Sequence, residues 1–422
     1  MLRSMYSAIA GLRAHQTKLD VTGNNISNVN TVGFKGSQTV FEDTLSQVLR
    51  NGSAPTQDTA GTNPAQVGLG VKLAGVTTNF SQGAAQNTGR STDFMINGDG
   101  FFVTQNGNQQ LYTRAGSFDF DGSGKLVTPD GGVLQGWTAV NGVVNTNGPI
   151  GPLSVPYGES LAPVATTSGK VEGNLDSEAR VTTPPTAIQT QIEMYDPQGN
   201  SQAINYTYTR TATGWDMQIS NATGPLTFTD ANGAPLVDGA GNPMTTKQLA
   251  FDTAGNLSPA TDATLNFDPG VPGWSAPVTL DMSKLTQYGG KTTVTATEQD
   301  GSAMGTLQSF ALSNDGTITG VYSNGLRQSI GQLALATFSN PGGLAKAGNS
   351  SYAPGDNSGV ALIGVAGTGG RGSLSAGALE MSNVDLAEEF TNLIVAQRGF
   401  QANSRVITTS DQVLQELVNL KQ

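Results

Sequence analysis

Apolar residues recur with helical spacing at the two ends of the chain and almost nowhere between them. Near the N-terminus they stand three or four positions apart, as on one face of a helix. This row comprises Leu2, Met5, Ile9, Leu12, Leu19 and Ile26, and Gln16 and Gly23 keep its spacing. Near the C-terminus every seventh residue is apolar, and the row comprises Leu386, Leu393, Phe400, Ile407 and Leu414, with Phe390 and Val418 beside it. The pattern predicts one helix over about residues 2–29 and another over about 382–420.

A helix with one narrow apolar stripe cannot bury that stripe alone. The partner of each helix is either the opposite end of the same chain or the ends of neighbouring copies, and the spacing leaves both open. Polar residues interrupt the rows at Gln16, Gln397, Ser404 and Asp411. These residues either set the register between helices or line a wet channel. Because a two-helix hairpin buries little area, we expect the isolated ends to be disordered and to order only in a polymer.

Between the ends the pattern is that of β-structure. Strand, turn and strand are expected around Asn97-Gly98, and alternating strands are expected over 203–209 and 215–219. Short strands with regular turn signals favour a sandwich or a small barrel. One short helix is suggested by Phe41, Leu45 and Val48, and Ser382 is expected to cap the C-terminal helix, with Asp385 at its third position.

These elements predict a nested α+β multidomain chain, with paired terminal helices and two mainly β domains. The expected parts are residues 1–32 and 379–422 as a terminal helical domain, 33–70 and 359–378 as linker segments, 71–144 and 286–358 as an inner β domain, and 145–285 as an inserted outer β domain. Nesting brings the two termini together and places the β domains progressively farther from them.

Composition narrows the function classes. Only 13% of the residues are charged, 55 are Gly, and the net charge is -11. An acidic surface argues against nucleic-acid binding, which needs a basic patch. The chain has no Cys, which excludes disulfides and thiolate metal sites. Its single histidine, His15, nearly rules out His-based metal or triad chemistry; we expect it to be solvated or to face a channel, and a pH switch is the less favoured interpretation.

The sequence offers no continuous apolar leader region and no apolar run of the ~20 residues that a membrane span needs. We therefore expect no membrane span, and a chain that is cytosolic or is exported without a cleaved signal peptide.

One segment partly resembles a calcium-binding loop. Asp119, Asp121 and Asp130 occupy its first, third and twelfth places, and Gly124 its sixth. The twelfth place usually holds Glu and the flanks have strand patterns, so a hairpin turn is the better interpretation. The glycines at 98–100 and 364–372 lack the Lys-Ser/Thr ending of a phosphate-binding loop. We therefore predict no catalytic, cofactor-binding or metal-binding residue.

Several stretches resemble the flagellar axial family of rod and hook proteins. They are Met5–Leu12, Leu19–Lys35, Ile96–Phe102, Tyr112–Phe118 and the tail Asn383–Ile407. Within the second stretch the motif residues are Asn24, Asn25, Asn28, Gly33, Phe34 and Lys35, and Ser27 stands where the family usually has Ala. The matching stretches cover both ends of the chain and part of the β region between them.

The resemblance implies a homopolymer, a helical tube around a central channel, with the terminal helices innermost and β layers outside. It also implies partners: rod and hook-filament junction proteins, a hook cap and the flagellar type III export apparatus. The place of action would be the extracellular part of the flagellum. Two other classes fit parts of the pattern: a β-rich adhesin or carbohydrate-binding protein, which leaves the terminal rows unexplained, and a polysaccharide hydrolase, for which no paired carboxylates can be placed.

Overall fold

The structure is a computed structural model that describes residues 2–55, 60–155, 158, 160–181, 186–274 and 277–419. The chain divides into two compact units. The first unit comprises Met1–Pro156, Phe310–Gly320 and Gln328–Gln422, and the second comprises Tyr157–Ser309 and Val321–Arg327. The second unit overlaps the expected insertion at 145–285 but begins and ends later in the sequence.

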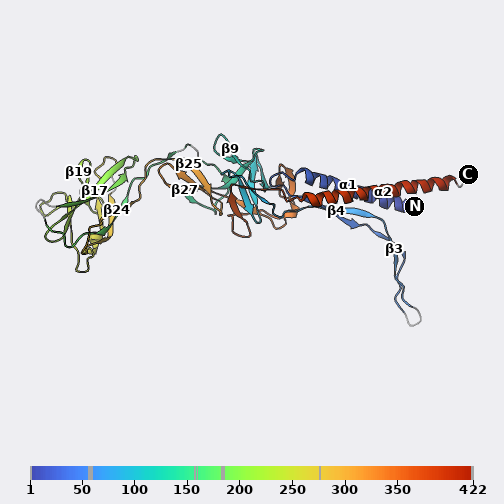
Figure 1. Cartoon of the computed structure of the whole chain (residues 1–422), viewed down its shortest axis with the longest axis horizontal. Helices are drawn as coiled ribbons and strands as arrows, with labels where there is room; N and C mark the ends of the chain where they lie inside the picture. Colours follow the sequence, from blue (N-terminus) through green and yellow to red (C-terminus); the bar gives the residue numbers. More distant parts are fainter. Residues whose placement is uncertain are drawn as a thin grey trace. The chain divides into compact units, whose positions relative to one another are not determined.

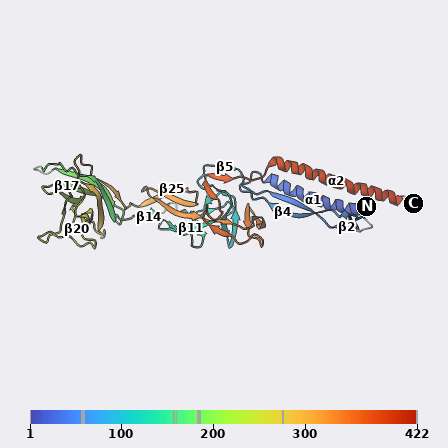
Figure 2. The same cartoon turned by 90° about the horizontal axis from the view of Figure 1, so that it is seen from below.

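Two long helices lie side by side in the first unit, and both views show the chain termini at the same end of the pair (Figures 1 and 2). Helix α1 spans Leu2–Ser27 and helix α2 spans Leu386–Asn419. The cap of α2 differs from the expectation. Asp385, not Ser382, is the N-cap, because its Oδ1 accepts the backbone N–H of Ala387 at 2.8 Å. Glu388 and Glu389 follow in the first turn, where the helix dipole favours negative charge.

A two-stranded ribbon follows α1, and we call it the arm. Strand β1 (Ser37–Asp43) pairs with β4 (Val71–Thr78), and β2 (Ser46–Arg50) pairs with β3 (Ala65–Gly68). The short helix suggested by Phe41, Leu45 and Val48 is therefore wrong. The strand partners lie well separated from one another in the sequence, and a local pattern does not show them. β1 and β4 contact α1, whereas all five residues of β2 are exposed.

The β body of the first unit is built on a sheet in which β27, β11, β7, β8, β30 and β29 are successive neighbours. Its strands are β7 (Phe101–Asn106), β8 (Gln109–Thr113), β9 (Asp119–Phe120), β10 (Leu126–Val127), β11 (Val133–Val140), β12 (Val143–Val144), β13 (Gly151–Pro152), β27 (Arg327–Leu333), β28 (Leu335–Thr337), β29 (Ala345–Gly348), β30 (Ser351–Ala353) and β31 (Leu362–Gly364), with a 3-10 turn at Pro341–Gly343. Aromatic side chains fill the core, among them Phe101, Tyr112, Phe338 and Tyr352.

Two small strand pairs connect this body to the segments next to the helices. Strand β6 (Phe94–Asn97) pairs with β32 (Ser373–Ala376), and β5 (Ala85–Asn87) pairs with β33 (Ala378–Glu380). The hairpin expected at Asn97-Gly98 is therefore wrong: the strands on either side exist, but β6 pairs with β32 and β7 pairs with β8. The segment before α2 is thus held by pairing with strands from the N-terminal part of the chain.

The second unit is a sandwich of two sheets, consistent with the expected class. One sheet has the order β20-β22-β23-β15-β24 and the other the order β16-β17-β18-β19, with β21 beside β18. Side chains from both sheets, including Tyr206, Trp215 and Phe267, form one buried core. The elements are β14 (Ser160–Leu161), β15 (Ser168–Asn174), β16 (Ala187–Tyr195), β17 (Ser201–Arg210), β18 (Trp215–Asn221), β19 (Gly224–Pro225), β20 (Phe228–Thr229), β21 (Thr246–Leu249), a 3-10 turn at Ala260–Ala263, β22 (Thr264–Phe267), β23 (Val278–Thr286), β24 (Thr295–Gln299), β25 (Gly305–Leu312) and β26 (Thr317–Tyr322), of which the last two extend into both units.

Candidate self-association surfaces

Helices α1 and α2 form an antiparallel pair whose register is visible in three contacts. The Asn25 side chain donates to Glu389, with Nδ2 and Oε1 2.7 Å apart. Farther along, His15 faces Gly399 and Gly11 faces Asn403. Residue numbers rise along one helix as they fall along the other. One of the two partners that the sequence left open, the opposite end of the same chain, is therefore in place.

Small side chains fill the interface between the two helices. In α1 the buried residues are Ala8, Gly11, Ala14, Thr22 and Asn25, and in α2 Ala396 is fully buried. A Cβ added to Gly11 would lie 2.8 Å from Asn403 Oδ1, and one added to Gly399 would lie 2.5 Å from the His15 ring. The two glycines therefore permit the close approach. The apolar spacing of the sequence did not predict these small interface residues. A glycine inside a helical pattern is the available signal, because it often marks a close contact between helices.

The apolar rows predicted from the sequence lie beside this interface rather than at its centre. On α1, Met5, Ile9, Leu12, Leu19 and Ile26 are half-buried, and the Leu2 side chain lies outside the described part. On α2, Leu393, Phe400, Ile407 and Leu414 are half-buried, whereas Leu386, Phe390 and Val418 are exposed. The helix pair thus leaves much of both rows open, and their role in packing between copies stays a prediction.

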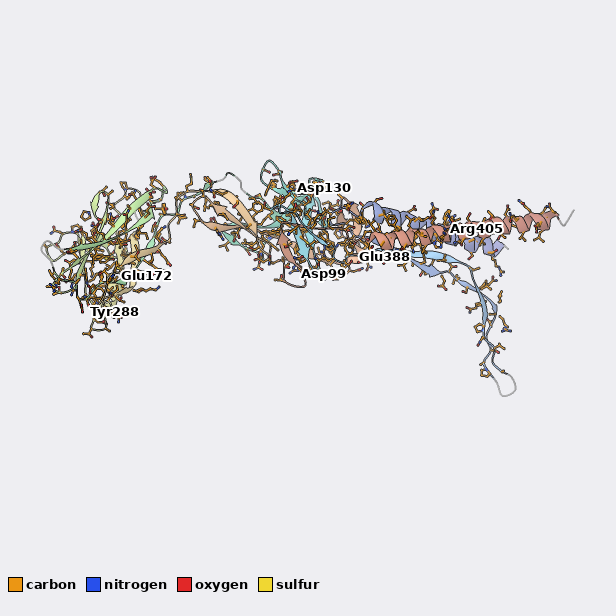
Figure 3. The ribbon with its side chains drawn as sticks, in the orientation of Figure 1. Asp99, Asp130, Glu172, Tyr288, Glu388 and Arg405 are labelled. Carbon is orange, nitrogen blue, oxygen red and sulfur yellow. The ribbon has the colours of Figure 1, made fainter. Side chains whose placement is uncertain are left out.

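Further apolar side chains of α2 and of the arm are exposed. On α2 they are Ile394, Val395, Val406, Val413 and Leu417, and on the arm they are Val40, Leu45, Val48, Leu49, Val67, Leu69, Leu73 and Val76. Figure 3 shows side chains projecting along the whole length of α2, where Glu388 marks its first turn and Arg405 a later one. Large exposed apolar surfaces of this kind mark interaction sites.

His15 lies half-buried where α1, α2 and the arm meet, and the expectation of a solvated or channel-facing residue stays a prediction. Its ring centroid is 6.1 Å from that of Phe41 in an edge-on arrangement, and its Nδ1 is buried without a hydrogen-bond partner. Burial, followed by the nearby charge of Lys18, lowers the pKa of His15. The ring therefore packs against Phe41 and faces Gly399 at this junction.

The asparagines of the family-like motif shape the end of α1. Asn25 Oδ1 accepts the Ser37 backbone N–H at 3.0 Å, and Asn25 Nδ2 donates to Ser37 O at 2.8 Å. Asn28 Nδ2 donates to Asn24 Oδ1 and to the Asn24 carbonyl, both at 2.9 Å. Asn25 thus joins α1, the start of the arm and, through Glu389, α2. The family-like motif is therefore structural at these positions.

Gly33 and Phe34 form the turn between α1 and the arm. Gly33 has a φ of 67°, and a Cβ there would lie 2.4 Å from the Ala115 backbone nitrogen, so only glycine fits. Phe34 lies beneath Lys346, whose Nζ is 5.3 Å from the ring centroid. This turn therefore packs the segment after α1 closely against the β body.

A buried ionic cluster lies next to this turn. Lys35 Nζ is 2.6 Å from Glu380 Oε1, and Arg114 is 3.3 Å from Glu380 Oε2. All three side chains are at most 2% exposed. Lys35 also donates to Ser81 O at 2.7 Å, and Glu380 Oε1 accepts the Gly83 N–H at 2.9 Å. The cluster joins the segment after α1, the β body and the segment before α2.

Burial lowers the pKa of both Lys35 and Arg114, and the Glu380 carboxylate opposes the shift in each case. Glu380 therefore compensates two buried cations, and its own lone pairs are occupied by donors. No sequence spacing pointed to this arrangement, because its three members are distant along the chain.

The acidic residues of the calcium-like loop have separate partners. Asp119 pairs with Arg90 at 2.5 Å, Asp121 Oδ1 accepts the N–H groups of Ser123 and Lys125 at 2.8 Å, and Asp130 lies 3.4 Å from Asn349 Nδ2. The segment forms the β9–β10 hairpin, as the turn interpretation expected.

Over the described residues, no three His, Cys, Asp or Glu side chains gather as a metal site would require. A cavity of about 360 Å³ lies beside the family-like motif, where Asn24, Asn28, Phe34, Lys346 and Tyr352 form part of its lining. None of the helices that the structure describes is long and apolar enough to cross a membrane.

Four family models match successive parts of the chain. They are Flagella basal body rod protein over residues 5–35, Flagellar hook protein FlgE/F/G D1 domain over 95–195, Flagellar basal body protein FlaE D2 domain over 174–302, and Flagellar basal body rod FlgEFG protein C-terminal over 375–420.

Full-length relatives agree with these models. The chain is 38% identical to the flagellar hook protein FlgE of Borreliella burgdorferi and 38% identical to that of Treponema pallidum, and each match covers 100% of both chains. It is 33% identical to the flagellar basal-body rod protein FlgG of Bacillus subtilis, again over 100% of both. A crystal structure of Helicobacter pylori flagellar hook protein FlgE2 aligns with a TM-score of 0.49 and 15% identity, covering 70% of this chain and 100% of that one.

Proposed function

The chain belongs to the flagellar hook protein FlgE family, whose members are structural components of the bacterial flagellum, and we propose that it polymerises through its helical end into the wall of the hook. In this proposal the polymer is a flexible helical tube that joins rod to filament and transmits torque. The hook subunit is a structural protein, and no step of the proposal requires catalysis.

One observation carries the proposal: the antiparallel helix pair leaves apolar side chains exposed along α2. Phe390 is 52% exposed, Ile394 is 55% exposed and Val418 is 66% exposed. A soluble monomer gains nothing from such a surface, which is an aggregation liability unless a partner covers it. Identical neighbours in a polymer supply that partner in every subunit.

The helix pair and the arm together offer more than one surface to neighbouring copies. α1 contacts α2 on one side and β1 and β4 of the arm on another. The apolar arm residues, among them Leu45 at 85% exposure, give a second surface for neighbouring copies. In the proposed tube the helices form the innermost wall, and the β units lie outside it.

A position in the distal rod is the second candidate, because a full-length relative carries a rod protein name. Hook and rod subunits share the helical end and the β body in this proposal, and they differ in where the polymer lies. Immunogold labelling of isolated basal bodies separates the two: label between rod and filament supports the hook, and label within the rod supports the alternative.

Family membership also supports proposals about partners. We propose that the subunit leaves the cell through the flagellar type III export apparatus without a cleaved signal peptide. It would then be added beneath a hook cap and meet rod and junction proteins at the two ends of the hook. A secretion assay in cells that lack the export apparatus tests the route, and the expected result is retention of the chain inside the cell.

Electron microscopy of the purified chain at high concentration tests polymerisation. We expect hollow tubes. Globular particles at every concentration and ionic strength would contradict the proposal, as would a reconstruction in which the terminal helices lie on the outer rim.

A further inference from the structure

Helix α2 carries exposed apolar residues on both sides of its contact with α1. We call the first set flank A; it consists of Leu386, Phe390 and Ile394, which are four residues apart. We call the second set flank B; it consists of Val395, Val406, Val413 and Leu417. Each of these side chains is at least 38% exposed in the single chain.

The two flanks face different directions. At about 100° per residue, flank A lies about 80–160° from the buried Ala396 in one sense, and flank B about 60–100° from it in the other. Between them, on the face turned away from α1, are the exposed charged residues Arg398, Arg405 and Glu416. A single neighbour therefore cannot cover both flanks, and the charged face between them is suited to solvent.

Two different apolar patches on one subunit favour a ring or a helical polymer over a two-fold dimer. A two-fold dimer uses the same patch on both copies, whereas contact between unlike patches produces a ring or an open helical polymer. Because flank A and flank B lie on one helix in every copy, each subunit offers a matching patch to the next. No third protein is needed to cover either flank.

We propose that flank A of one copy packs against flank B of a second copy, with the two α2 helices parallel. This inference rests on the proposed function and names the contact within that polymer. Placing Phe390 opposite Val406 of the second copy shifts the copies by roughly 24 Å along the helix axis, at about 1.5 Å per residue. Each flank reaches the edge of the α1–α2 interface, flank A at Leu386 and flank B at Leu417, so the contact extends packing that already exists within the chain.

A charge-complementation experiment tests the contact. Phe390→Glu and Val406→Lys are made singly and together, and the critical concentration for polymerisation is measured by sedimentation. Each single change places an unpaired charge in the contact and should raise the critical concentration about tenfold or more. The double variant pairs the charges between copies and should return most of the lost assembly. Phe390→Glu with Gln401→Lys is the matched control, because Gln401 lies on the side of flank A and a lysine there would not meet the introduced carboxylate of the next copy.

Thiol cross-linking gives an independent measurement, since the chain has no native cysteine. Phe390→Cys and Val406→Cys chains are polymerised together and oxidised. Disulfide-linked dimers should form in the mixture and not in either chain alone. Dimers from Phe390→Cys alone, single charge variants that assemble normally, or a double variant no better than its control would each overturn the inference while leaving polymerisation intact. Failure of the unmodified chain to polymerise would instead contradict the proposed function.

Discussion

At the residue scale, the most consequential group is Glu380. Its carboxylate faces two cations, Lys35 and Arg114, in a site closed to water. Buried ion pairs add little net stability compared with apolar packing, but removing one partner leaves uncompensated charge. The cluster therefore ties the segments beside both helices to the β body, and its loss affects all three.

We expect Glu380→Ala to lower the free energy of unfolding of the first unit by about 3–5 kcal/mol, because Lys35 and Arg114 would remain buried without a carboxylate. Thermal unfolding followed by circular dichroism measures the change. Glu42→Ala is the control within the same unit: Glu42 pairs with Lys72 at 2.8 Å, but the two side chains are 48% and 61% exposed. That variant should leave the free energy of unfolding nearly unchanged, because exposed ion pairs contribute little to stability, and an equal effect of the two changes would contradict the argument.

Aspartate-centred turns give the chain a defined acid sensitivity. The backbone N–H four residues ahead is the main cause of a lowered pKa in Asp121, Asp230 and Asp238. These carboxylates titrate at lower pH in the folded chain than in the unfolded one. Their contribution to stability is therefore present above the unfolded pKa of about 3.9 and is lost as the pH falls through the folded pKa.

We thus expect the urea midpoint of unfolding to stay level from neutral pH to about pH 5 and to fall below about pH 4. In a chain carrying Asp230→Asn and Asp238→Asn, the side-chain oxygen of each asparagine can still accept the backbone N–H groups of the turn, but two titrating groups are removed. The urea midpoint of this chain should therefore fall less over the same pH range. Identical acid profiles for the two chains would contradict the role assigned to these turns.

At the element scale, the spacing of the helix pair depends on glycine. Gly399→Ala would place a Cβ 2.5 Å from the His15 ring, which is itself packed against Phe41. Overpacking of this kind costs about 1–3 kcal/mol, and we expect the critical concentration for polymerisation to rise. Adding His15→Ala should reverse the effect. Gly23→Ala, with nothing within 4 Å of the added Cβ, is the matched control and should leave assembly unchanged or improve it. Equal effects at the two glycines would show that only helix propensity had changed.

Both helices, and strands such as those at 203–209 and 215–219, could be predicted from the sequence, because their periodicity is local. The features that could not be predicted depend on contacts between residues far apart in the sequence. The residues of the helix interface are small, such as Ala8 and Gly11, and hydrophobic spacing emphasises the larger neighbours instead. β6 has a clear strand pattern, but its partner β32 lies far along the chain. The same applies to the arm and to the Lys35–Glu380 pair, since neither long-range pairing nor buried charge leaves a periodic signal.

At the scale of the whole molecule, the order of the two ends is expected to depend on assembly. Many residues of α2 are exposed, and a two-helix hairpin is marginal on its own. We expect the amides of 2–27 and 386–419 to exchange rapidly in dilute monomer and slowly in the polymer, as measured by hydrogen exchange and mass spectrometry. The core strands of both units, such as β17, should be protected in both states. Slow exchange of the helices in dilute monomer would contradict this expectation.

The second unit is expected to tune the shape of the polymer rather than to hold it together. Leu161 of β14 is paired with Gly305 of β25, so residues 162–304 leave and re-enter the structure at adjacent strand positions. Replacing them with a two-residue Asn-Gly turn should preserve that pairing. Because the exposed apolar rows lie on α2 and the arm, the shortened chain should still form tubes, with altered curvature. Electron microscopy of the shortened and full chains at equal concentration makes the comparison. Loss of all assembly in a shortened chain whose first unit still unfolds at the parent temperature would show that the second unit carries contacts essential to the polymer.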